Sequence, residues 1–256
     1  MVLRVKQGGK QVDLFSQMSP GKVLDFPMGG GRQSWELVSL GYHVVGADLF
    51  PRADGRRQLP CVCADANCPF PFKDASFDYV LSCEGIEHLE NQAGFIRECA
   101  RVLKPGGSLL LTTPNVMHLH ARLSYLLAGQ RILKRGLVNE VQTLRNVEGG
   151  RFYHGHAFLI DYFRLRYLLR LSSFTRIEVF TDRYSPTSIA FIWLAPILFA
   201  ATRLSIRMSV RKDRRKGKVR TYNSVFSEIV RDVFSPALLF GKRMIVRAEK
   251  AAGIVP

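Results

Sequence analysis

The amino-acid sequence predicts an α/β fold built on a mostly parallel β-sheet. Within the first 115 residues, short apolar segments rich in β-branched residues alternate with segments of helical periodicity. Three consecutive glycines, Gly29 to Gly31, follow the first of these apolar segments. The next one ends in an acid, Asp48. Together these observations are typical of strand–helix–strand units whose strands run parallel.

The first such unit extends from Lys22 to Asp48. We expect Lys22 to Phe26 to form a strand, and Gln33 to Leu40 a helix that ends before Gly41. Tyr42 to Asp48 is then the second strand. The glycines between them allow the backbone to approach a ligand, and the helix that follows directs free N–H groups toward it.

The spacing of Asp48 indicates a ligand of the nucleotide type. Asp48 lies 17 residues after Gly31, close to the roughly 20 residues expected before the acid that binds ribose in nucleotide-binding units. Two carboxylate oxygens match two hydroxyl donors. The alternative is a surface acid that caps the next loop.

The alternation continues to about residue 115. We expect strands at Cys61 to Ala64 and at Ser76 to Ser82. Asn91 to Leu103 has helical periodicity, and the turn Lys104 to Gly107 ends it. Ser108 to Thr113 is then a buried strand.

Length and composition limit the options further. The chain has 256 residues, 47% of them hydrophobic, which is enough for one sizeable core with an appendage. The five cysteines are odd in number and indicate reduced thiols in a cytoplasmic protein. Cys61, Cys63 and Cys68 lie close together, but no fourth ligand follows at zinc-finger spacing, so no metal site is expected. Met1 to Gln17 lacks the continuous apolar segment of a secretory signal.

The net charge of +16 is unevenly distributed along the chain. Residues 1–120 contain 12 basic and 12 acidic residues, so the whole excess lies in residues 121–256. A neutral first half beside a strongly basic second half predicts a catalytic module joined to a part that meets an anionic partner.

Six short motifs follow one another through the first half. They are Asp25-Phe26-Pro27-Met28-Gly29-Gly30-Gly31, Gly46-Ala47-Asp48, Asp65-Ala66, Phe77-Asp78-Tyr79-Val80-Leu81-Ser82, Glu87-His88-Leu89 and Leu103-Lys104-Pro105-Gly106-Gly107. Their order and spacing resemble those of class I S-adenosylmethionine-dependent methyltransferases of type 11. The last motif is the most specific, because dinucleotide dehydrogenases of similar outline lack it. The resemblance covers residues 20–115.

The resemblance implies a Rossmann-like, seven-stranded sheet with helices on both faces and S-adenosyl-L-methionine bound across its carboxyl edge. Asp25, Gly29 and Gly31 match the acid and the last two glycines of the family pattern Asp-x-Gly-x-Gly-x-Gly. Pro27 stands where the first glycine is usual. Since proline has a fixed φ and no N–H, the loop must bend differently or hold the methionine moiety with other groups.

The resemblance also assigns further cofactor contacts. Asp48 matches the acid that binds the ribose, and Leu49 the apolar residue beside the adenine. Asp65 with Ala66 matches the edge that receives the adenine amino group. Positions that line the methyl-transfer chamber in the family are matched by Ser82, Cys83 and His88.

Two histidines are the candidate catalytic residues. Methyl transfer is an in-line displacement at a sulfonium, and a base is needed only when the acceptor must lose a proton. For a hydroxyl acceptor, His88 or His156 is suited to take that proton. The alternative for His88 is packing beside the cofactor without catalysis. His118 and His120 are expected to be solvated helix residues.

The resemblance to the methyltransferase family also predicts the domain organisation. We expect a methyltransferase core at residues 1–183, with a lid insertion at about residues 116–150 that covers the acceptor site. Residues 184–256 are expected to hold the last sheet elements and a basic, partly apolar C-terminal extension. In the extension, residues 224–246 resume an amphipathic pattern.

Two adjacent stretches of the extension suit a membrane surface. Residues 184–202 carry no charge, and residues 203–220 contain nine Lys or Arg and one acid. We expect residues 184–202 to form a partly buried strand or helix that touches lipid; a membrane span is the alternative, although Pro196 interrupts it. The basic cluster then binds an anionic membrane surface. One alternative for the cluster is a solvated loop. Another is a nucleic-acid contact, although residues 203–220 lack the interleaved aromatic residues typical of such contacts.

These features predict methyl transfer to a hydroxyl of a glycan or lipid-linked acceptor, as in polysaccharide biosynthesis, at the cytoplasmic face of the inner membrane. One alternative is an RNA or protein methyltransferase that contacts its partner through the basic tail. Another is a catalytically inactive S-adenosylmethionine-binding protein, for which Pro27 is the argument. The sequence makes no prediction of the oligomeric state.

Overall fold

The computed structural model describes residues 10–51, 59–131, 138–147, 151–217 and 222–253. The chain divides into two compact units, which are described one at a time. The first unit holds the chain up to Pro114, Val138–Asp182 and the chain from Arg243; the second holds Asn115–Leu137 and Arg183–Lys242.

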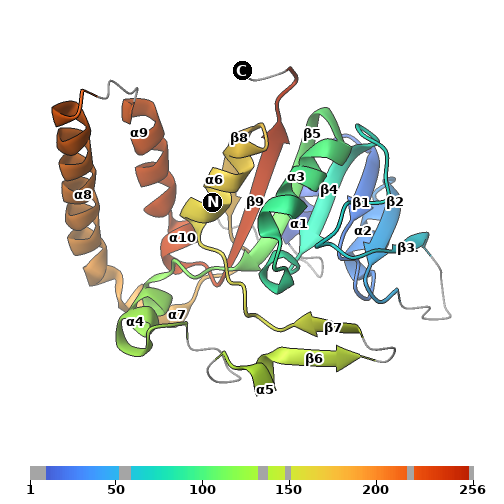
Figure 1. Ribbon diagram of the computed structural model, residues 1–256, viewed down its shortest axis with the longest axis horizontal. Coiled ribbons are helices and arrows are strands. Elements are labelled where there is room, and N and C mark those ends of the chain that lie inside the picture. The colour runs from blue at the N-terminus through green and yellow to red at the C-terminus, as the bar shows by residue number, and fades with distance from the viewer. Residues whose placement is uncertain (1–9, 52–58, 132–137, 148–150, 218–221, 254–256) are drawn as a thin grey trace. The chain divides into compact units, whose positions relative to one another are not determined.

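The first unit is built on a seven-stranded sheet with the strand order β3-β2-β1-β4-β5-β9-β8 (Figure 1). The strands are β1 (Lys22–Asp25), β2 (His43–Asp48), β3 (Cys61–Cys63), β4 (Phe77–Cys83), β5 (Leu103–Pro114), β8 (Phe174–Phe180) and β9 (Arg243–Lys250). β1 to β5 pair in parallel, whereas β9 is antiparallel to both of its neighbours, β5 and β8. The predicted Rossmann-like, seven-stranded sheet is confirmed. Its order reverses at β1, and open α/β sheets bind ligands beyond the carboxyl ends of the strands at such a reversal.

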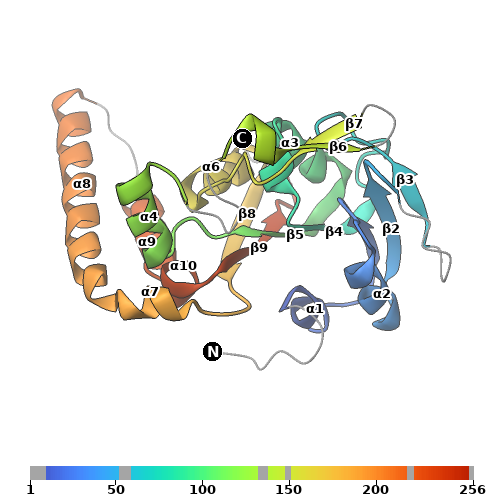
Figure 2. The ribbon, with the colours of Figure 1, turned by 90° about the horizontal axis from the view of Figure 1, so that it is seen from below.

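Helices cover both faces of this sheet, as predicted (Figure 2). One face carries α1 (Lys10–Phe15) and α2 (Arg32–Ser39), and the other carries α3 (Gln92–Val102) and α6 (Tyr162–Leu171). The side chains of Asn91 and Asp161 cap α3 and α6 by accepting a backbone N–H bond from the residue three positions on. Local sequence therefore sets where both helices begin.

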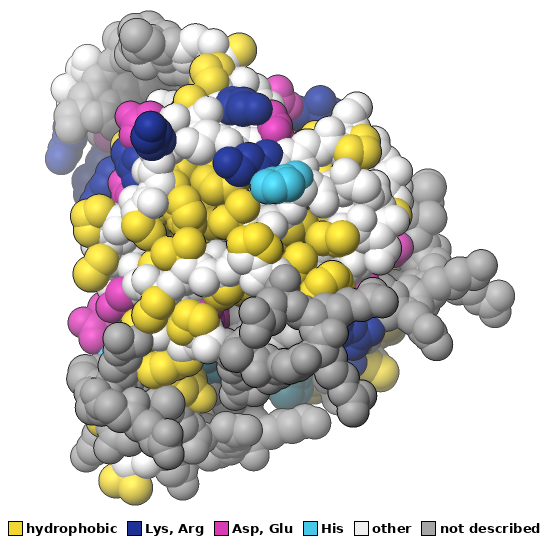
Figure 3. Space-filling model, turned by 90° about the vertical axis from the view of Figure 1, so that its right-hand side faces the viewer, with side chains coloured by type: hydrophobic (Ala, Val, Ile, Leu, Met, Phe, Trp, Pro, Cys, Tyr) yellow, Lys and Arg dark blue, Asp and Glu magenta, His cyan; other side chains and the backbone are white. Residues whose placement is uncertain are grey.

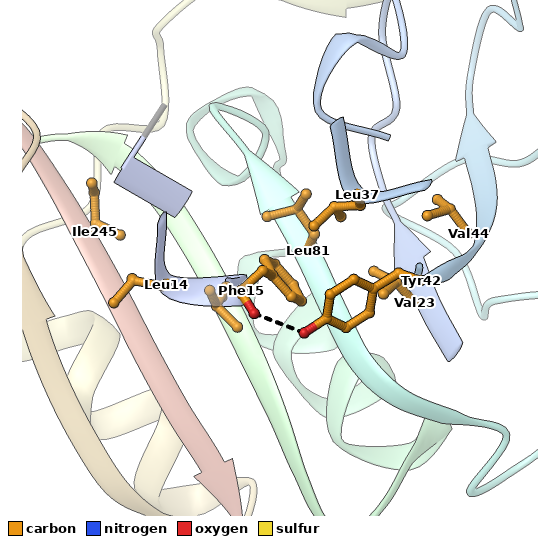
Figure 4. Packing of buried hydrophobic residues seen from close by; sticks show 9 residues of the cluster. Leu14, Phe15, Val23, Leu37, Tyr42, Val44, Leu81 and Ile245 are labelled. Carbon is orange, nitrogen blue, oxygen red and sulfur yellow. Dashed lines mark hydrogen bonds between the residues drawn. The ribbon is translucent and has the colours of Figure 1, made fainter. Parts of the chain in front are cut away.

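A cluster of buried residues joins α1 and α2 to the sheet (Figure 4). The rings of Phe15, Tyr42 and Tyr79 meet edge to face, with centroids 5.2 to 5.7 Å apart. The Tyr42 hydroxyl donates toward the carbonyl oxygens of Phe15 and Met18, at 2.9 and 3.0 Å. Burial raises the pKa of Tyr42 to about 12. This hydroxyl fastens the end of α1, whose last carbonyl groups have no partner within the helix.

The outer edge of the sheet at β3 carries exposed apolar side chains. Seen from the side on which β3 lies, the surface shows hydrophobic side chains gathered beside Lys and Arg (Figure 3). Val62 on β3, and Val38 and Leu40 at the end of α2, are each more than one-third exposed. β3 is only three residues long, and a short edge strand offers little backbone for pairing with another chain.

A β-hairpin lies between β5 and α6 in the sequence. It consists of β6 (Leu144–Val147) and β7 (Arg151–His154), and the short helix α5 (Glu140–Thr143) precedes it. The loop after the hairpin is fastened to the short 3-10 helix η1 (Ile86–His88). In that loop, the backbone N–H of Phe158 donates to the Glu87 carbonyl at 3.1 Å. The predicted lid at residues 116–150 is thus divided, because the hairpin belongs to the first unit and residues 115–137 belong to the second.

The second unit is helical. It contains α4 (Leu119–Ala128), α7 (Pro186–Ala190), the 3-10 helix η2 (Ile192–Leu194), α8 (Ala195–Arg215), α9 (Tyr222–Val233) and α10 (Pro236–Phe240). The Asn115 amide donates to the carbonyl oxygens of Leu238 and Gly241 at 3.0 and 2.8 Å, which links the two chain segments of this unit.

His118 lies inside the second unit, so the prediction of a solvated residue was wrong. Its side chain is 4% exposed and caps α4 by accepting the Ala121 N–H at 3.2 Å. The Ser188 hydroxyl lies 2.8 Å from the same ring nitrogen, to which it donates. Burial, together with the charge of Arg131, lowers the pKa of His118 to about 4.

Residues 184–202 are mainly helical, which is one of the two predicted conformations, and they form no strand of the sheet. The last sheet element, expected within residues 184–256, is β9, which pairs with β5 from Ser108↔Glu249 to Pro114↔Arg243. The amphipathic pattern predicted for residues 224–246 covers α9 and α10 and ends at Phe240, because Arg243 begins β9. In the part of the chain that the structure describes, no helix combines the length and apolarity needed to cross a bilayer.

Candidate functional site

The glycine-rich loop leads from β1 to α2 at the carboxyl edge of the sheet. Gly29 and Gly31 have φ angles of 55° and 68°, in the left-handed region that favours glycine. A Cβ atom added at Gly29 or Gly30 would meet no atom within 4 Å. At Gly31 it would lie 2.7 Å from Cε of Met28. Gly29 and Gly30 are therefore open toward a ligand, whereas Gly31 serves the packing of the loop itself.

Pro27 packs against Gly85, the second residue after β4. A Cβ atom at Gly85 would lie 2.4 Å from Cδ and 2.8 Å from Cγ of Pro27. The Phe26–Pro27 peptide bond is cis. The missing glycine at position 27 is thus matched by a glycine on the facing loop, and the proline ring occupies the space that a side chain at position 85 would need.

Asp48 joins the loops that follow β1 and β2. One of its carboxylate oxygens accepts the Gly29 N–H at 2.7 Å, and the other accepts the Phe50 N–H at 2.8 Å. Each carboxylate oxygen has two lone pairs, so both retain capacity for a further donor. Asp48 is 9% exposed and faces the cavity described next.

A cavity of about 740 Å³ opens at this edge of the sheet. Its described walls come from the loops after β1, β2, β3 and β4 and from β7 of the hairpin. They consist of Phe26, Pro27, Gly29, Gly30, Asp48, Leu49, Phe50, Asp65, Ala66, Asn67, Gly85, His88, Leu89, Glu90, Asn91, Tyr153 and His154. The volume is within the range of small-molecule and cofactor sites.

The acidic residues of this cavity favour a cationic ligand. Asp48, Asp65 and Glu90 are part of its wall, and no Lys or Arg occurs among the described wall residues. One oxygen of Asp65 accepts from the backbone and side-chain nitrogens of Asn67, at 2.8 and 3.1 Å. These contacts fix the Asp65 carboxylate at the end of the cavity where the loop after β3 lies.

The fold matches solved proteins over nearly its whole length. A SAM-dependent methyltransferase of Archaeoglobus fulgidus superposes with a TM-score of 0.51 and 14% identity, over 93% of this chain and 94% of that one. At this identity the likeness concerns the fold. The sequence of residues 24–111 itself matches the family model described as a methyltransferase domain. Residues 24–111 are a class I methyltransferase domain.

Curated relatives match parts of the chain. A demethylmenaquinone methyltransferase of Corynebacterium urealyticum is 40% identical over 98 residues, which are 37% of this chain and 42% of that protein. A ubiquinone biosynthesis O-methyltransferase of Aromatoleum aromaticum is 29% identical over 153 residues, 55% of this chain and 65% of that protein. The chain therefore spans less than two-thirds of the length of either relative.

S-adenosylmethionine is the cofactor of methyltransferases of this fold, and the cavity of the methyltransferase domain fits it. Gly29 and Gly30 leave the backbone open for a close approach. Asp48 offers two acceptor oxygens to a ribose, and Leu49 lies beside it in the cavity wall. The acidic wall suits the positive charge of a sulfonium. Asp48, Leu49, Asp65, Ala66 and Gly29 thus lie together in one cavity.

Asp25 lies outside the cavity wall of the methyltransferase domain. Its side chain is 2% exposed and accepts the Ser34 hydroxyl hydrogen bond at 2.5 Å, which joins β1 to α2. Burial, opposed by the Ser34 hydrogen bond and reinforced by the negative charge of Asp48, raises the pKa of Asp25 to about 7. Asp25 therefore supports the loop through its bond to Ser34, and Gly31 through its packing against Met28. Neither residue is part of the described wall.

Ser82 and Cys83 also lie outside the cavity, contrary to the position that the family comparison gave them. Ser82 is fully buried, and Cys83 packs against the core cluster on the α1 and α2 face. Burial raises the pKa of the Cys83 thiol well above its usual range. The reason is the alternation of the strand: Cys83 is the last residue of β4 and lies on the same face as Tyr79 and Leu81, which pack on the same cluster. Gly85 and His88 reach the cavity instead.

His88 is part of the cavity wall, and His156 lies next to it. Their ring centroids are 5.1 Å apart, although the residues are 68 positions apart in the sequence. Nδ1 of His88 lies 2.5 Å from the His154 carbonyl oxygen. A carbonyl only accepts, so Nδ1 carries the proton and Nε2 holds the lone pair. The structure thus brings the two predicted catalytic histidines together.

Several wall residues had no signal in the sequence. Tyr153 and His154 come from the hairpin, and Nε2 of His154 lies 2.6 Å from the Glu90 carboxylate. Asn67 and Asn91 are joined by two hydrogen bonds, of 3.0 and 3.2 Å, between their loops. Asn67 has a weak signal, because it is a polar residue shortly after a predicted strand. Tyr153 and His154 follow no strand of the predicted sheet, so their positions in the sequence do not indicate the cavity.

Asp25 should make the stability of the domain depend on pH. Because the pKa of Asp25 is higher in the folded than in the unfolded state, its contribution to the free energy of unfolding is fully present below about pH 4 and is lost as pH rises through about 7. The free energy of unfolding of the wild type should therefore fall by roughly 3–4 kcal/mol between these limits. In Asp25→Asn this decrease should be absent, which urea unfolding of both proteins from pH 4 to 8 measures.

The matched control for this series is Asp74→Asn, whose carboxylate is 78% exposed and pairs with Arg101. This variant should keep the pH profile of the wild type. Parallel profiles for the wild type and Asp25→Asn would contradict the assignment of the pH dependence to Asp25.

Proposed function

We propose that this protein transfers the methyl group of S-adenosylmethionine to a hydroxyl of a lipid-like acceptor at the cytoplasmic face of the membrane. The observation that carries the proposal is the cavity of the methyltransferase domain, whose wall contains Asp48, the open glycines and His88, with the ring of His156 next to that of His88. The acceptor class is favoured by the two curated relatives, whose names concern menaquinone and ubiquinone. Both relatives favour a lipid-linked acceptor over a free glycan.

The reaction needs little from the protein beyond placement and the removal of one proton. S-adenosylmethionine supplies an electrophilic methyl carbon on a positively charged sulfur. Asp48 holds the ribose end, and Phe26, Pro27 and Leu89 keep water away from the walls of the cavity. The acceptor hydroxyl loses its proton at the His88 and His156 pair, because Nε2 of His88 carries a lone pair directed away from the His154 carbonyl.

The second unit offers a surface suited to a membrane. Within α8, no residue is buried, and Ile197, Leu204 and Met208 are 60%, 58% and 63% exposed. Spacings of seven and four place these three side chains on one stripe of the helix. Arg203 and Arg207 follow on the flank of the stripe. An apolar stripe beside cations binds interfaces that contain anionic lipid.

The transfer itself is tested with S-adenosylmethionine that carries a labelled methyl group. The protein is incubated with detergent-solubilised membrane lipid, with a water-soluble glycan fraction and with total RNA, each in a separate reaction. We expect label in an organic-extractable product from the lipid reaction. Label confined to RNA, to glycan or to protein would overturn the lipid assignment. Saturable cofactor binding without transfer to any fraction would favour a binding protein without catalysis.

Membrane attachment is tested by sedimentation with vesicles. We expect the protein to sediment with vesicles that contain phosphatidylglycerol, and less in 1 M salt, where charges are screened within roughly 3 Å. The variant Leu204→Ser with Met208→Ser should lose most of this binding. Leu171→Ser on α6, where the side chain is 65% exposed, is the matched control and should bind like the wild type. Equal binding of all three proteins, or binding to RNA alone, would contradict the membrane role of α8.

A further inference from the structure

Three side chains with donor atoms for a metal ion converge beside the cavity. Glu87, His88 and His156 each offer one such atom, and the three atoms lie within 4.8 Å of one another. Glu87 and His88 belong to η1, and His156 follows β7. We propose that these three residues bind one divalent transition-metal ion at the wall of the cavity.

Two of the three side chains are held in place by hydrogen bonds to residues outside the cluster. Oε2 of Glu87 accepts the Thr113 hydroxyl hydrogen bond at 2.9 Å, and the Glu87 side chain is fully buried. Nδ1 of His88 donates to the His154 carbonyl, so Nε2 is the nitrogen that can bind a cation. Metal-binding histidines commonly donate their other ring N–H to a carbonyl or carboxylate in this way.

The backbone fixes the third side chain near the other two. The Phe158 N–H donates to the Glu87 carbonyl at 3.1 Å, and the Gln92 side chain donates to the carbonyl oxygens of Ile86 and Phe158, at 2.9 and 2.5 Å. These bonds tie the segment that carries His156 to η1. The proximity of His156 to His88 is therefore built into the fold by contacts outside the cluster.

The donor set indicates which ions would bind. Two imidazoles and one carboxylate suit Zn²⁺, Co²⁺ or Mn²⁺ better than Mg²⁺ or Ca²⁺, which prefer oxygen. Protein nitrogen and oxygen atoms bind these ions at about 2.0–2.2 Å, so ligands of one ion lie at most about 4.4 Å apart. Since the three atoms lie within 4.8 Å of one another, binding one ion requires them to approach by at most about 0.4 Å. With three protein ligands, the ion keeps open positions for another oxygen ligand.

The role of the ion rests on the function proposed above, and it replaces the proton transfer to His88, because Nε2 of His88 cannot bind the ion and take a proton at the same time. An acceptor hydroxyl bound at an open position becomes more acidic, as metal-bound water does. Its proton passes to solvent, the oxygen attacks the methyl carbon, and the O–CH₃ bond forms while the S–CH₃ bond breaks. The products are the methyl ether and S-adenosylhomocysteine. No oxidant or reductant is needed. The alternative is direct hydrogen bonding among Glu87, His88 and His156, with one histidine acting as the base.

Binding of Co²⁺ to the untagged protein tests the site. We expect one ion per chain, seen as visible d–d absorption bands, and the same stoichiometry for Zn²⁺ by calorimetry. His156→Gln and Glu87→Gln should each weaken binding more than tenfold, since loss of a ligand costs at least as much as loss of an outer partner. Glu87→Gln keeps an oxygen that can accept the Thr113 hydrogen bond. His43→Gln removes an exposed imidazole at the start of β2 and should bind like the wild type.

Three results would overturn the site. They are no binding to the wild type, equal binding to His156→Gln when thermal unfolding shows that it is folded, and sulfur-to-cobalt charge-transfer bands, which would place the ion on Cys61 or Cys63. Transfer activity is measured separately, before and after chelation and after Mn²⁺ is added back. Full activity after chelation would refute the catalytic role of the ion but would not count against the metal-binding site itself. Absence of transfer under every condition, with Co²⁺ bound, would count against the proposed function alone.

Discussion

The Asp48 carboxylate is the constraint on which the candidate site depends. It accepts N–H bonds from Gly29 and Phe50, and so holds the loops after β1 and β2 at one spacing. Parallel pairing of β1 with β2 brings these loops to the same edge of the sheet. The Met28 N–H bond to the Ala47 carbonyl also joins this loop to β2, but the Asp48 carboxylate is the side chain that holds Gly29 itself. A hydrogen bond to a charged group contributes about 1.5–3 kcal/mol, enough to select one loop conformation.

A second constraint explains how the loop tolerates Pro27. The proline ring lies against Gly85 at a distance that no side chain there would allow. Gly46 plays a similar part for Met28, because a Cβ atom at Gly46 would lie 2.1 Å from the Met28 sulfur. The loop therefore departs from the usual glycine pattern at one position, and glycines on neighbouring strands and loops compensate for it. This packing gives Pro27 a structural role in the loop, so the proline does not by itself indicate lost cofactor binding.

Much of the first unit was predictable, because its signals are local. β1 to β5 and their helices follow from periodicity and from glycine or proline turns, and Asp48, Leu49, Asp65 and Ala66 follow from their positions at strand ends. The position of β9 was not predictable, since it pairs with β5 only after the chain has passed through the whole second unit. Cys83 was misplaced although the alternation of β4 puts it on the same face as Tyr79 and Leu81, toward the core cluster. The cluster of Glu87, His88 and His156 arises from contacts across 68 positions, which spacing alone does not reveal.

The Asp48 cavity is the expected binding site of S-adenosylmethionine. Calorimetric titration with S-adenosylhomocysteine tests it most directly, with Asp48→Asn as the variant and Asp74→Asn as the surface control. Asparagine at position 48 keeps one acceptor oxygen but loses the charge, so affinity should fall at least tenfold, in line with about 1.5–3 kcal/mol for a hydrogen bond to a charged group. The control should bind like the wild type. Absence of heat with the wild type, or equal affinity of Asp48→Asn and the wild type, would contradict the account.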